Sequence, residues 1–543
     1  MNKLLLSAAI AALFAGQAQA ALQVTAGVPN ITNALTQTRQ EIWISGSSAA
    51  TPFVEKSVAA DCTGTVYKYS NSTNDFTWVC NSSIAAGTIN IVHKLDAGGS
   101  VTAVKSAKGI SSGKTYWETA NLNAATCAAA ITSNGVTVTP CTPTSPTSAA
   151  HAGDINLADV DAAQFEKAAN GGVAGASAVA SSAPLATQVF GVVVNSRLYA
   201  ALQVAQVAAG KLASTCISTS IVAGQNNGTF TSPTNNTDAC MPTLTTAQLS
   251  AVFGANRTTD WLNLFFGGDA SATTLQSLVT VQDSHDVPAN TNIHYCSRTA
   301  GSGTLAAVNI KLENQCSNTN EAIVTTAAQT IGQETDLLGG NQKVVHSMSG
   351  SGDLENCLEG LNDAVTKGSG STIFTFPAVT NAFDPANTAG PQSDFRWAVG
   401  IMSLDRNFAL GKKYRFIKID GSAPTAENVV NGKYKLWAEL VSLGATSANP
   451  LAVDILKNLG SSDQIVALNQ AHPFGVSGFL GTATNPNFLP SYDTAIAPGT
   501  KLFAAWDSAR PVNPWTHATA TGVNLNHCRT PSIPGGTNAI PGL

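Results

Sequence analysis

The sequence predicts an α/β fold, and two local patterns indicate it. Short apolar runs of strand length alternate with longer segments whose apolar residues recur at helical spacing. At residues 41–58 and 293–312, such a strand and helix are joined by a turn rich in glycine and serine. This alternation is typical of helices packed against a mostly buried sheet. No internal repeat of fixed period is visible.

The expected elements alternate along most of the chain. Strands are expected at residues 41–44, 89–93, 189–195, 293–296, 397–402 and 414–419. Helices are expected after Pro52 and at residues 101–108, 162–169, 198–212, 244–253, 305–312, 452–459 and 462–469, with Thr245 as the N-cap of the helix at 244–253. A Ser/Thr/Pro-rich run within residues 111–150 predicts an exposed insertion.

The first twenty residues have the pattern of a secretory signal peptide. Lys3 precedes an apolar run from Leu4 to Ala15, and Ala18-Gln19-Ala20 supplies small residues for cleavage. The run is shorter than the roughly 20 residues that span a bilayer. We therefore expect an exported protein, periplasmic or secreted, that is cleaved after Ala20 and has no membrane span.

The charge balance excludes one class of partner. The chain carries 33 acidic and 28 basic residues, a net charge of −5, and only 11% of its residues are charged. Nucleic-acid-binding proteins normally present a basic surface, so nucleic acid is not an expected partner. The eight histidines form no HxxxH or HExxH motif, so neither a metal nor another cofactor is expected.

Ten cysteines in an exported chain indicate disulfides. Sequence alone leaves their connectivity open, and proximity along the chain is the only guide. The pairs expected on this basis are Cys62–Cys80, Cys127–Cys141, Cys216–Cys240, Cys296–Cys316 and Cys357–Cys528.

The turn RTAGSGT, residues 298–304, is the strongest candidate functional motif. It places Arg298, two glycines and hydroxyl groups between a strand and a helix. Glycine permits close backbone approach, a helix N-terminus offers unpaired N–H groups, and arginine can bind an oxyanion through two donors. Residues 46–52 form a second turn of this kind. Both turns suit a small oxyanion, and an ordinary capped helix is the alternative for each.

Several segments, in order, resemble the phosphate-binding proteins of bacterial ABC importers. The turn at 298–304 is similar to the family's anion loop, Arg-x-Asp-Gly-Ser-Gly-Thr, and residues 46–52 are similar to its first anion loop. Three further segments resemble family motifs: DINLAD at 154–159, the stretch from Leu244 to Trp261, and VNGKY at 430–434.

This resemblance implies a two-lobed type 2 periplasmic-binding-protein fold, here with disulfide-pinned insertions. Lobe 1 would comprise residues 41–195 and 396–543, with an insertion at about 62–150, and lobe 2 residues 196–395. The ligand clamped between the lobes would be inorganic phosphate or a similar oxyanion. The membrane component of an ABC importer is the implied protein partner.

The resemblance also implies the residues that bind the ligand. They are Ala50, Thr51, Ser100, Asp159, Arg298, Ser302, Gly303 and Thr304, of which Ser100 matches only after a register shift. An aspartate facing an anion favours a ligand that still carries a proton, as phosphate and arsenate do near neutral pH and sulfate does not. The chain departs from the family pattern where Ala300 replaces the aspartate that pairs the arginine, and where Ala158 and Ala50 replace hydroxyl residues.

The function expected from these observations is non-enzymatic binding of phosphate. One alternative is a cell-surface or secreted protein that keeps the fold with weak or no phosphate binding, favoured by the disulfides, the polar insertions and the altered anion loops. The other is an exported phosphatase with Ser302 or Ser351 as nucleophile, although no GxSxG turn or adjacent His–Asp pair supports it.

Overall fold

The computed structural model describes most of the chain between residues 22 and 532. The described residues are 22–31, 38–70, 74–122, 125–217, 237–254, 258, 260–264, 275, 288, 290–313, 316, 343–368, 374–376, 395–406, 411–445, 447–459, 461–470, 478–482, 511–519 and 525–532. The expected signal peptide, residues 1–20, lies outside them. Among the described residues, no helix has the length and apolar character needed to cross a membrane.

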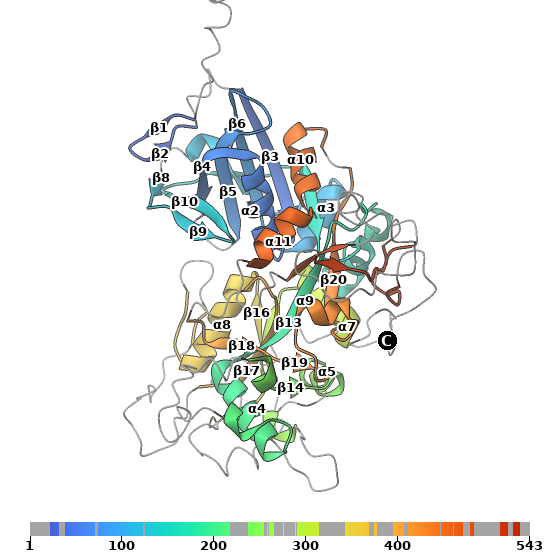
Figure 1. The fold of residues 1–543 in the computed structure, drawn as a ribbon. Coiled ribbons are helices and arrows are strands. Elements are labelled where there is room, and N and C mark those ends of the chain that lie inside the picture. The colour runs from blue at the N-terminus through green and yellow to red at the C-terminus, as the bar shows by residue number, and fades with distance from the viewer. Residues whose placement is uncertain are drawn as a thin grey trace, which may run out of the picture.

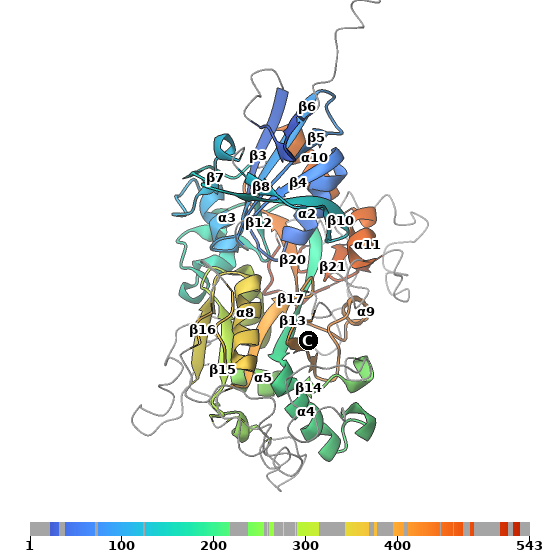
Figure 2. The same cartoon turned by 90° about the vertical axis from the view of Figure 1, so that its left-hand side faces the viewer.

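A mixed sheet runs through the whole molecule (Figures 1 and 2). Across it lie, in order, β16 (Val344–Met348), β15 (His294–Arg298), β17 (Ala398–Ser403), β13 (Ala186–Asn195), β20 (Trp437–Ser442), β12 (Ile155–Ala158), β3 (Thr38–Gly46), β6 (Thr88–Leu95), β5 (Asp75–Ser82), β4 (Cys62–Tyr69), β10 (Val136–Pro143) and β8 (Ala125–Cys127). Strands that branch from this path are β9 (Ile131–Ser133), β18 (Tyr414–Phe416), β21 (Phe479–Thr482) and β22 (Val512–Asn513). The architecture is α/β, as the sequence predicts.

Strand β13 joins the two halves of this sheet. Its residues 186–189 pair antiparallel with β20, and its residues 190–194 pair antiparallel with β17. All ten of its residues are buried, which agrees with the apolar run at residues 189–194. We call the part built on β12, β3 and β6 the upper half and the part built on β15, β16 and β17 the lower half, as they lie in Figure 1.

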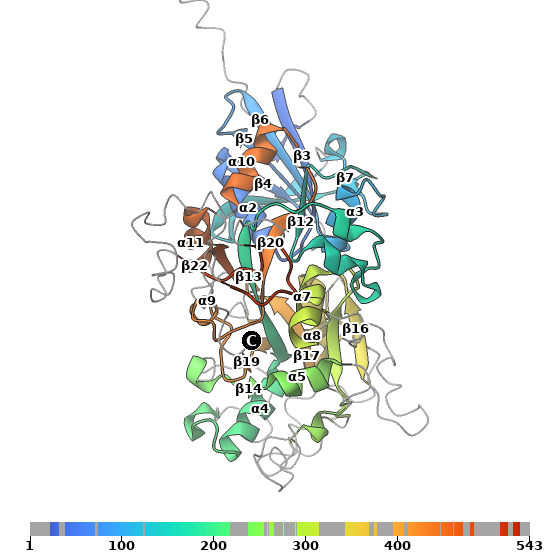
Figure 3. The same ribbon diagram turned by 90° about the vertical axis from the view of Figure 1, so that its right-hand side faces the viewer.

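Helices cover both halves (Figures 1 and 3). Those of the upper half are α2 (Thr51–Ala60), α3 (Ser100–Ala107), α10 (Pro450–Asn458) and α11 (Ser462–Gln470); those around the lower half are α4 (Ser196–Ala208), α5 (Thr246–Phe253), α7 (Gly303–Leu312) and α8 (Ser351–Asp363); and α9 (Ala426–Val430) lies beside the crossing strands. Local signals explain several starts. Pro52 lies in the first turn of α2, and Thr245 forms the expected N-cap of α5, where it makes a capping box with Gln248.

The expected helix at residues 162–169 is wrong. The structure has two 3₁₀ turns there, η2 (Ala162–Glu166) and η3 (Ala168–Asn170). Lys167 separates them with an extended backbone, φ −70° and ψ 135°. The Asn170 amide donates to the Gln164 carbonyl at 3.0 Å, so a side chain fixes the bend that sequence periodicity does not show.

Five disulfides connect the ten cysteines. The expected pairs Cys62–Cys80, Cys127–Cys141 and Cys216–Cys240 are confirmed. The expected pairs Cys296–Cys316 and Cys357–Cys528 are wrong, because the structure joins Cys296 to Cys357 and Cys316 to Cys528. Helix α8, which carries Cys357, packs against β15, which carries Cys296, so packing rather than chain distance decides the pair.

The segment expected as an exposed insertion is attached to the edge of the sheet. Strand β10 pairs parallel with β4, and Cys127 and Cys141 face each other between β8 and β10. Residues 62–95 supply β4, β5 and β6 and therefore belong to the sheet itself. The division of the chain into lobes at residues 195 and 396 stays a prediction.

Candidate functional site

Arg298 lies at the end of β15 and is 3% exposed. Its Nη2 donates to Ser48 Oγ at 3.0 Å and to the Ser349 carbonyl at 2.9 Å, and its Nη1 donates to Ser351 Oγ at 3.4 Å. None of these three acceptors carries a charge. Burial lowers the pKa of the guanidinium, and the charge of Asp159 partly offsets this effect. Within the described chain, Arg298 Nε is buried without a hydrogen-bond partner.

Asp159 directly follows β12 and is 2% exposed. Its carboxylate accepts a hydrogen bond from the Ser47 hydroxyl, and its backbone N–H donates to Ser100 Oγ at 3.2 Å. Burial raises the pKa of Asp159, while the Ser47 bond and the charges of Arg298 and Lys94 act in the opposite direction. The site therefore contains a buried carboxyl group that holds or shares a proton more readily than an exposed aspartate.

Gly303, the first residue of α7, brings the two halves into contact beside Asp159. A Cβ atom at this position would lie 2.3 Å from Ser100 Oγ and 2.6 Å from Asp159 Oδ2, so only glycine fits there. Nearby, the Val101 N–H donates to the Gly301 carbonyl at 2.9 Å. The loop at 298–304 thus packs directly against the start of α3 and against Asp159.

Four helices begin around these side chains. They are α2 at Thr51, α3 at Ser100, α7 at Gly303 and α8 at Ser351. The first turn of a helix carries unpaired N–H groups and partial positive charge. Together with Arg298, these helix starts supply positive charge and N–H donors to the region that also holds the Asp159 carboxyl group.

Some of the predicted donors are already bonded within the protein. The Ala50 N–H donates to Ser47 Oγ at 3.1 Å, and Thr51 Oγ1 donates to Asp96 Oδ2 at 2.6 Å. Ser302 Oγ accepts the Leu305 N–H at 3.4 Å as the N-cap of α7, a bond that leaves its own proton unused. A ligand must therefore compete with internal hydrogen bonds for the donors of the turn at residues 46–52 more than for those of the turn at residues 298–304.

A buried ion pair contacts the turn at residues 46–52. Lys94 pairs with Asp96, and Lys94 Nζ also donates to the Ser47 carbonyl at 2.8 Å. Burial raises the pKa of Asp96, and the charge of Lys94 opposes that shift. Because Asp96 also accepts from Thr51, the pair fixes the turn at both ends.

The eight predicted site residues lie in one contiguous buried region, joined by the contacts above. Their role in holding a ligand stays a prediction. Sequence reasoning did not single out the residues that position them, which are Ser47, Ser48, Lys94, Asp96 and Ser349, and it considered Ser351 only as a nucleophile. One signal could have found two of these, because Ser349-Gly350-Ser351-Gly352 stands between a strand and a helix as residues 298–304 do.

One cluster has the composition of a metal site. Glu439, His517 and His527 are buried, and one potential ligand atom from each lies within 4.8 Å of the others. Because these three residues lie far apart in the sequence, they form no recognisable sequence motif. Each imidazole nitrogen already has a partner. His517 Nδ1 lies 2.8 Å from Glu439 Oε2, and its Nε2 lies 2.7 Å from Lys311 Nζ. His527 Nδ1 lies 2.8 Å from Asp161 Oδ1, and its Nε2 accepts the Glu439 N–H at 3.0 Å. These contacts satisfy the cluster as a hydrogen-bond network.

The two serines considered as nucleophiles have structural contacts. Ser302 caps α7, and Ser351 accepts from Arg298. Neither contact involves a histidine, which a serine nucleophile would use as its base.

Comparison with known proteins gives no family assignment. No protein-family model matches the sequence, and a search of curated proteins finds no similar one. Among solved structures, an ABC transporter substrate-binding protein with bound phosphate from Clostridium perfringens aligns with 80% of this chain and 98% of its own at 12% identity, with a TM-score of 0.36. An ABC-type phosphate transport receptor from Vibrio cholerae aligns with 79% of this chain and 97% of its own at 12% identity, with a TM-score of 0.32. PstS from Borrelia burgdorferi aligns with 81% of this chain and 98% of its own at 10% identity, with a TM-score of 0.30. At this level of similarity, the α/β architecture rests on the strands and helices described above.

Proposed function

We propose that this chain is an exported solute-binding protein that holds a protonated tetrahedral oxyanion, phosphate or arsenate, at the site of Arg298 and Asp159. The observation that carries the proposal is the bracing of Arg298. A buried guanidinium held by neutral oxygens, with Nε unpartnered among the described residues, keeps a charge and a donor for an additional group. Because burying a guanidinium with no carboxylate bonded directly to it among the described residues is costly, an oxyanion that accepts from it would stabilise the site.

Asp159 is the residue that selects the ligand in this proposal. When ionised, a form that the charges of Arg298 and Lys94 favour against the effect of burial, its carboxylate repels an anion without a proton and accepts a hydrogen bond from an anion that has one. Phosphate and arsenate satisfy this condition near neutral pH, and sulfate does not. The two lobes, with the boundaries predicted above, would close on the anion, and an importer's membrane component would receive it.

Titration calorimetry on ligand-stripped protein tests the proposal. We expect phosphate and arsenate to bind at concentrations of about 1 mM or below, a range that allows for the altered first turn, and sulfate not to bind. The absence of any phosphate binding at millimolar concentration would exclude the proposed function.

Four variants test the site itself. We expect Arg298→Ala and Asp159→Ala each to weaken phosphate binding by more than about tenfold, because each removes a charged hydrogen-bonding group. The matched controls are Arg39→Ala and Asp238→Ala, whose side chains are 47% and 69% exposed, and these should leave affinity unchanged. Unchanged affinity in both site variants would remove this site from the proposal.

A second candidate is a surface protein that keeps the fold without binding phosphate. The observation that favours it is the internal use of the donors of Ala50 and Thr51 described above. This candidate predicts no heat with any of the three anions, together with recovery of the native protein in the cell-surface fraction. Recovery in the periplasmic fraction with measurable phosphate binding would exclude it.

A further inference from the structure

The C-terminal part of the described chain lies beside the strands that connect the two halves. We call residues 511–519 and 525–532 the C-terminal strap; its residues 511–518 are all buried. Strand β22 of the strap pairs with β21, and Asn513 Nδ2 donates to Thr187 Oγ1 on β13 at 3.1 Å. The strap is therefore attached to the crossing strand β13.

Two histidines of the strap are bonded to buried carboxylates. His517 Nδ1 lies 2.8 Å from Glu439 Oε2 on β20, and His527 Nδ1 lies 2.8 Å from Asp161 Oδ1. The backbone N–H groups of the same histidines also donate to these two carboxylates, each at 2.9 Å. Since Asp161 follows Asp159 by two positions, the strap is anchored next to the proposed site.

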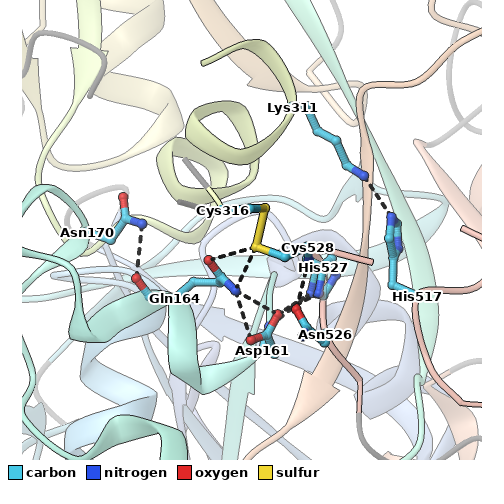
Figure 4. Close-up of a disulfide and its surroundings, with 9 residues drawn as sticks. All are labelled: Asp161, Gln164, Asn170, Lys311, Cys316, His517, Asn526, His527 and Cys528. Carbon is cyan, nitrogen blue, oxygen red and sulfur yellow. Dashed lines mark hydrogen bonds and ion pairs between the residues drawn. A yellow bond between two sulfur atoms is a disulfide. The ribbon is translucent and has the colours of Figure 1, made fainter. Parts of the chain in front are cut away.

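The same strap is fastened to the end of α7 (Figure 4). Cys528 forms a disulfide with Cys316, which lies shortly after the last residue of α7, Leu312. Lys311, in the last turn of the helix, places its Nζ 2.7 Å from His517 Nε2. One polar contact thus joins α7 to the strap, and one covalent bond joins the strap to Cys316, four positions after the helix ends.

Helix α7 also contacts the upper half before it reaches the strap. At its middle, Asn309 Nδ2 donates to Asn170 Oδ1 in η3 at 2.8 Å. At its start, the Gly301 carbonyl accepts the Val101 N–H at 2.9 Å. The helix that follows the predicted anion loop is therefore tied at its start, middle and end.

We propose that the C-terminal strap is a positioning device that holds α7, and with it the loop at 298–304, against Asp159 and Ser100 before a ligand arrives. The strap reaches the site through its bonds to Lys311 and Cys316 at the end of α7 and through Asp161, two positions after Asp159. Holding a binding loop in its bound arrangement lowers the ordering cost of association, so the strap raises affinity. The part of this proposal that concerns affinity rests on the proposed function, and the part that concerns α7 does not.

Hydrogen–deuterium exchange on the full chain tests the positioning of α7. In the double variant Cys316→Ser/Cys528→Ser, we expect the amides of 298–312 to exchange about tenfold faster, because local opening becomes easier. The matched control Cys127→Ser/Cys141→Ser loses a disulfide between β8 and β10 and should leave these amides unchanged. Equal exchange of α7 in the two double variants would overturn the proposal.

A single substitution covers the case in which the double variant does not fold. Lys311→Met removes the contact with His517 and keeps the disulfide, and we expect faster exchange of α7 here too. Unchanged exchange of α7 in this variant would also overturn the proposal.

Phosphate titration separates this inference from the proposed function. If the wild type binds phosphate, Cys316→Ser/Cys528→Ser should weaken binding by about threefold to tenfold, mainly through faster release. Unchanged affinity would contradict the strap's role in binding. If the wild type binds no phosphate, the proposed function fails, and the exchange of α7 still decides whether the strap positions the helix.

Discussion

Arg298 is oriented by oxygens that carry no charge. Where the family pattern has an aspartate, this chain has Ala300, and the guanidinium is instead held by Ser48, Ser351 and the Ser349 carbonyl. A carboxylate partner would fix the side chain and also cancel most of its charge. Neutral acceptors fix it and leave the charge for a ligand, so the loss of the aspartate need not abolish anion binding.

The serines that brace Arg298 should therefore affect affinity without contacting the anion. We expect Ser48→Ala and Ser351→Ala each to reduce phosphate affinity by about threefold to tenfold, the value of one hydrogen bond of about 0.5–1.5 kcal/mol. Calorimetric titration measures the effect. Ser347→Ala, at an exposed position of β16, is the matched control, and wild-type affinity in both bracing variants would show that other contacts orient Arg298.

A buried histidine predicts how stability depends on pH. Burial lowers the pKa of His294 well below its ordinary value, and the neighbouring charges of His346 and Arg396 act in the same direction. The unfolded chain gains a proton at this residue below about pH 6.5, whereas the folded protein keeps it neutral. The contribution of His294 to stability is therefore fully present above pH 6.5 and is lost as the pH falls.

We expect the wild type to lose about 2 kcal/mol more unfolding free energy than His294→Leu between pH 7.5 and pH 5. Urea unfolding at the two pH values measures this difference. An equal loss in His294→Leu and the wild type would show that this residue does not titrate differently on folding.

At the scale of elements, the start of α7 depends on the missing side chain of Gly303. Alanine normally favours a helix over glycine by about 1 kcal/mol. Here the added Cβ would meet Ser100 Oγ at 2.3 Å and Asp159 Oδ2 at 2.6 Å. We expect Gly303→Ala to destabilise the protein by about 1–3 kcal/mol, as overpacking does, when urea unfolding is measured.

A double-mutant cycle shows whether crowding causes that loss. Ser100→Ala removes one of the atoms that the new methyl group would meet, so the cost of Gly303→Ala should be smaller in that background. Additive effects of the two substitutions would attribute the loss to the contact with Asp159 rather than to the contact with Ser100.

Elements whose signals are local could be predicted from the sequence. The strand–turn–helix units that contain 41–58 and 293–312 follow from apolar periodicity and glycine-rich turns, and the cap at Thr245 follows from its own capping box. The same local signals placed Arg298 and Ser302 at the junction of β15 and α7.

Features that depend on distant contacts could not be predicted in this way. The bend at Lys167 replaced an expected helix, and the partner of Cys296 depends on how α8 packs on β15. At the site, the ion pair of Lys94 and Asp96 is not part of a recognisable motif. Its role depends on hydrogen bonds to the turn at residues 46–52, which lies almost fifty residues earlier in the chain. Residues that position a site are thus harder to recognise than residues within its motifs.

At the scale of the whole molecule, two disulfides act on the same region from different sides. Cys296–Cys357 joins β15 to α8, whose starting turn braces Arg298. Cys316–Cys528 joins the end of α7 to the strap across a sequence separation of 212 residues. Together they restrain the elements on both sides of the predicted anion loop, which agrees with a site that is assembled before binding.

Exposure predicts which of these bonds reduces first. Both cysteines of Cys316–Cys528 are partly exposed, whereas each of the other four disulfides has at least one buried cysteine. Because a thiolate must reach a sulfur atom to attack it, mild reduction of the native protein followed by alkylation should label Cys316 and Cys528 before the rest. Mass spectrometry of the labelled peptides measures the order.

The protein in which only Cys316–Cys528 is reduced should also be less stable, because this disulfide closes the longest loop of the five. The chain-entropy model assigns about 5.4 kcal/mol to a loop of this size, so a clear fall in the unfolding temperature is expected. Earlier labelling of Cys62 or Cys127, whose partners are buried, would mean that the strap shields its disulfide from solution. Labelling of Cys316 and Cys528 without a fall in unfolding temperature would mean that the polar contacts of Lys311, His517 and His527 hold the strap without the covalent bond.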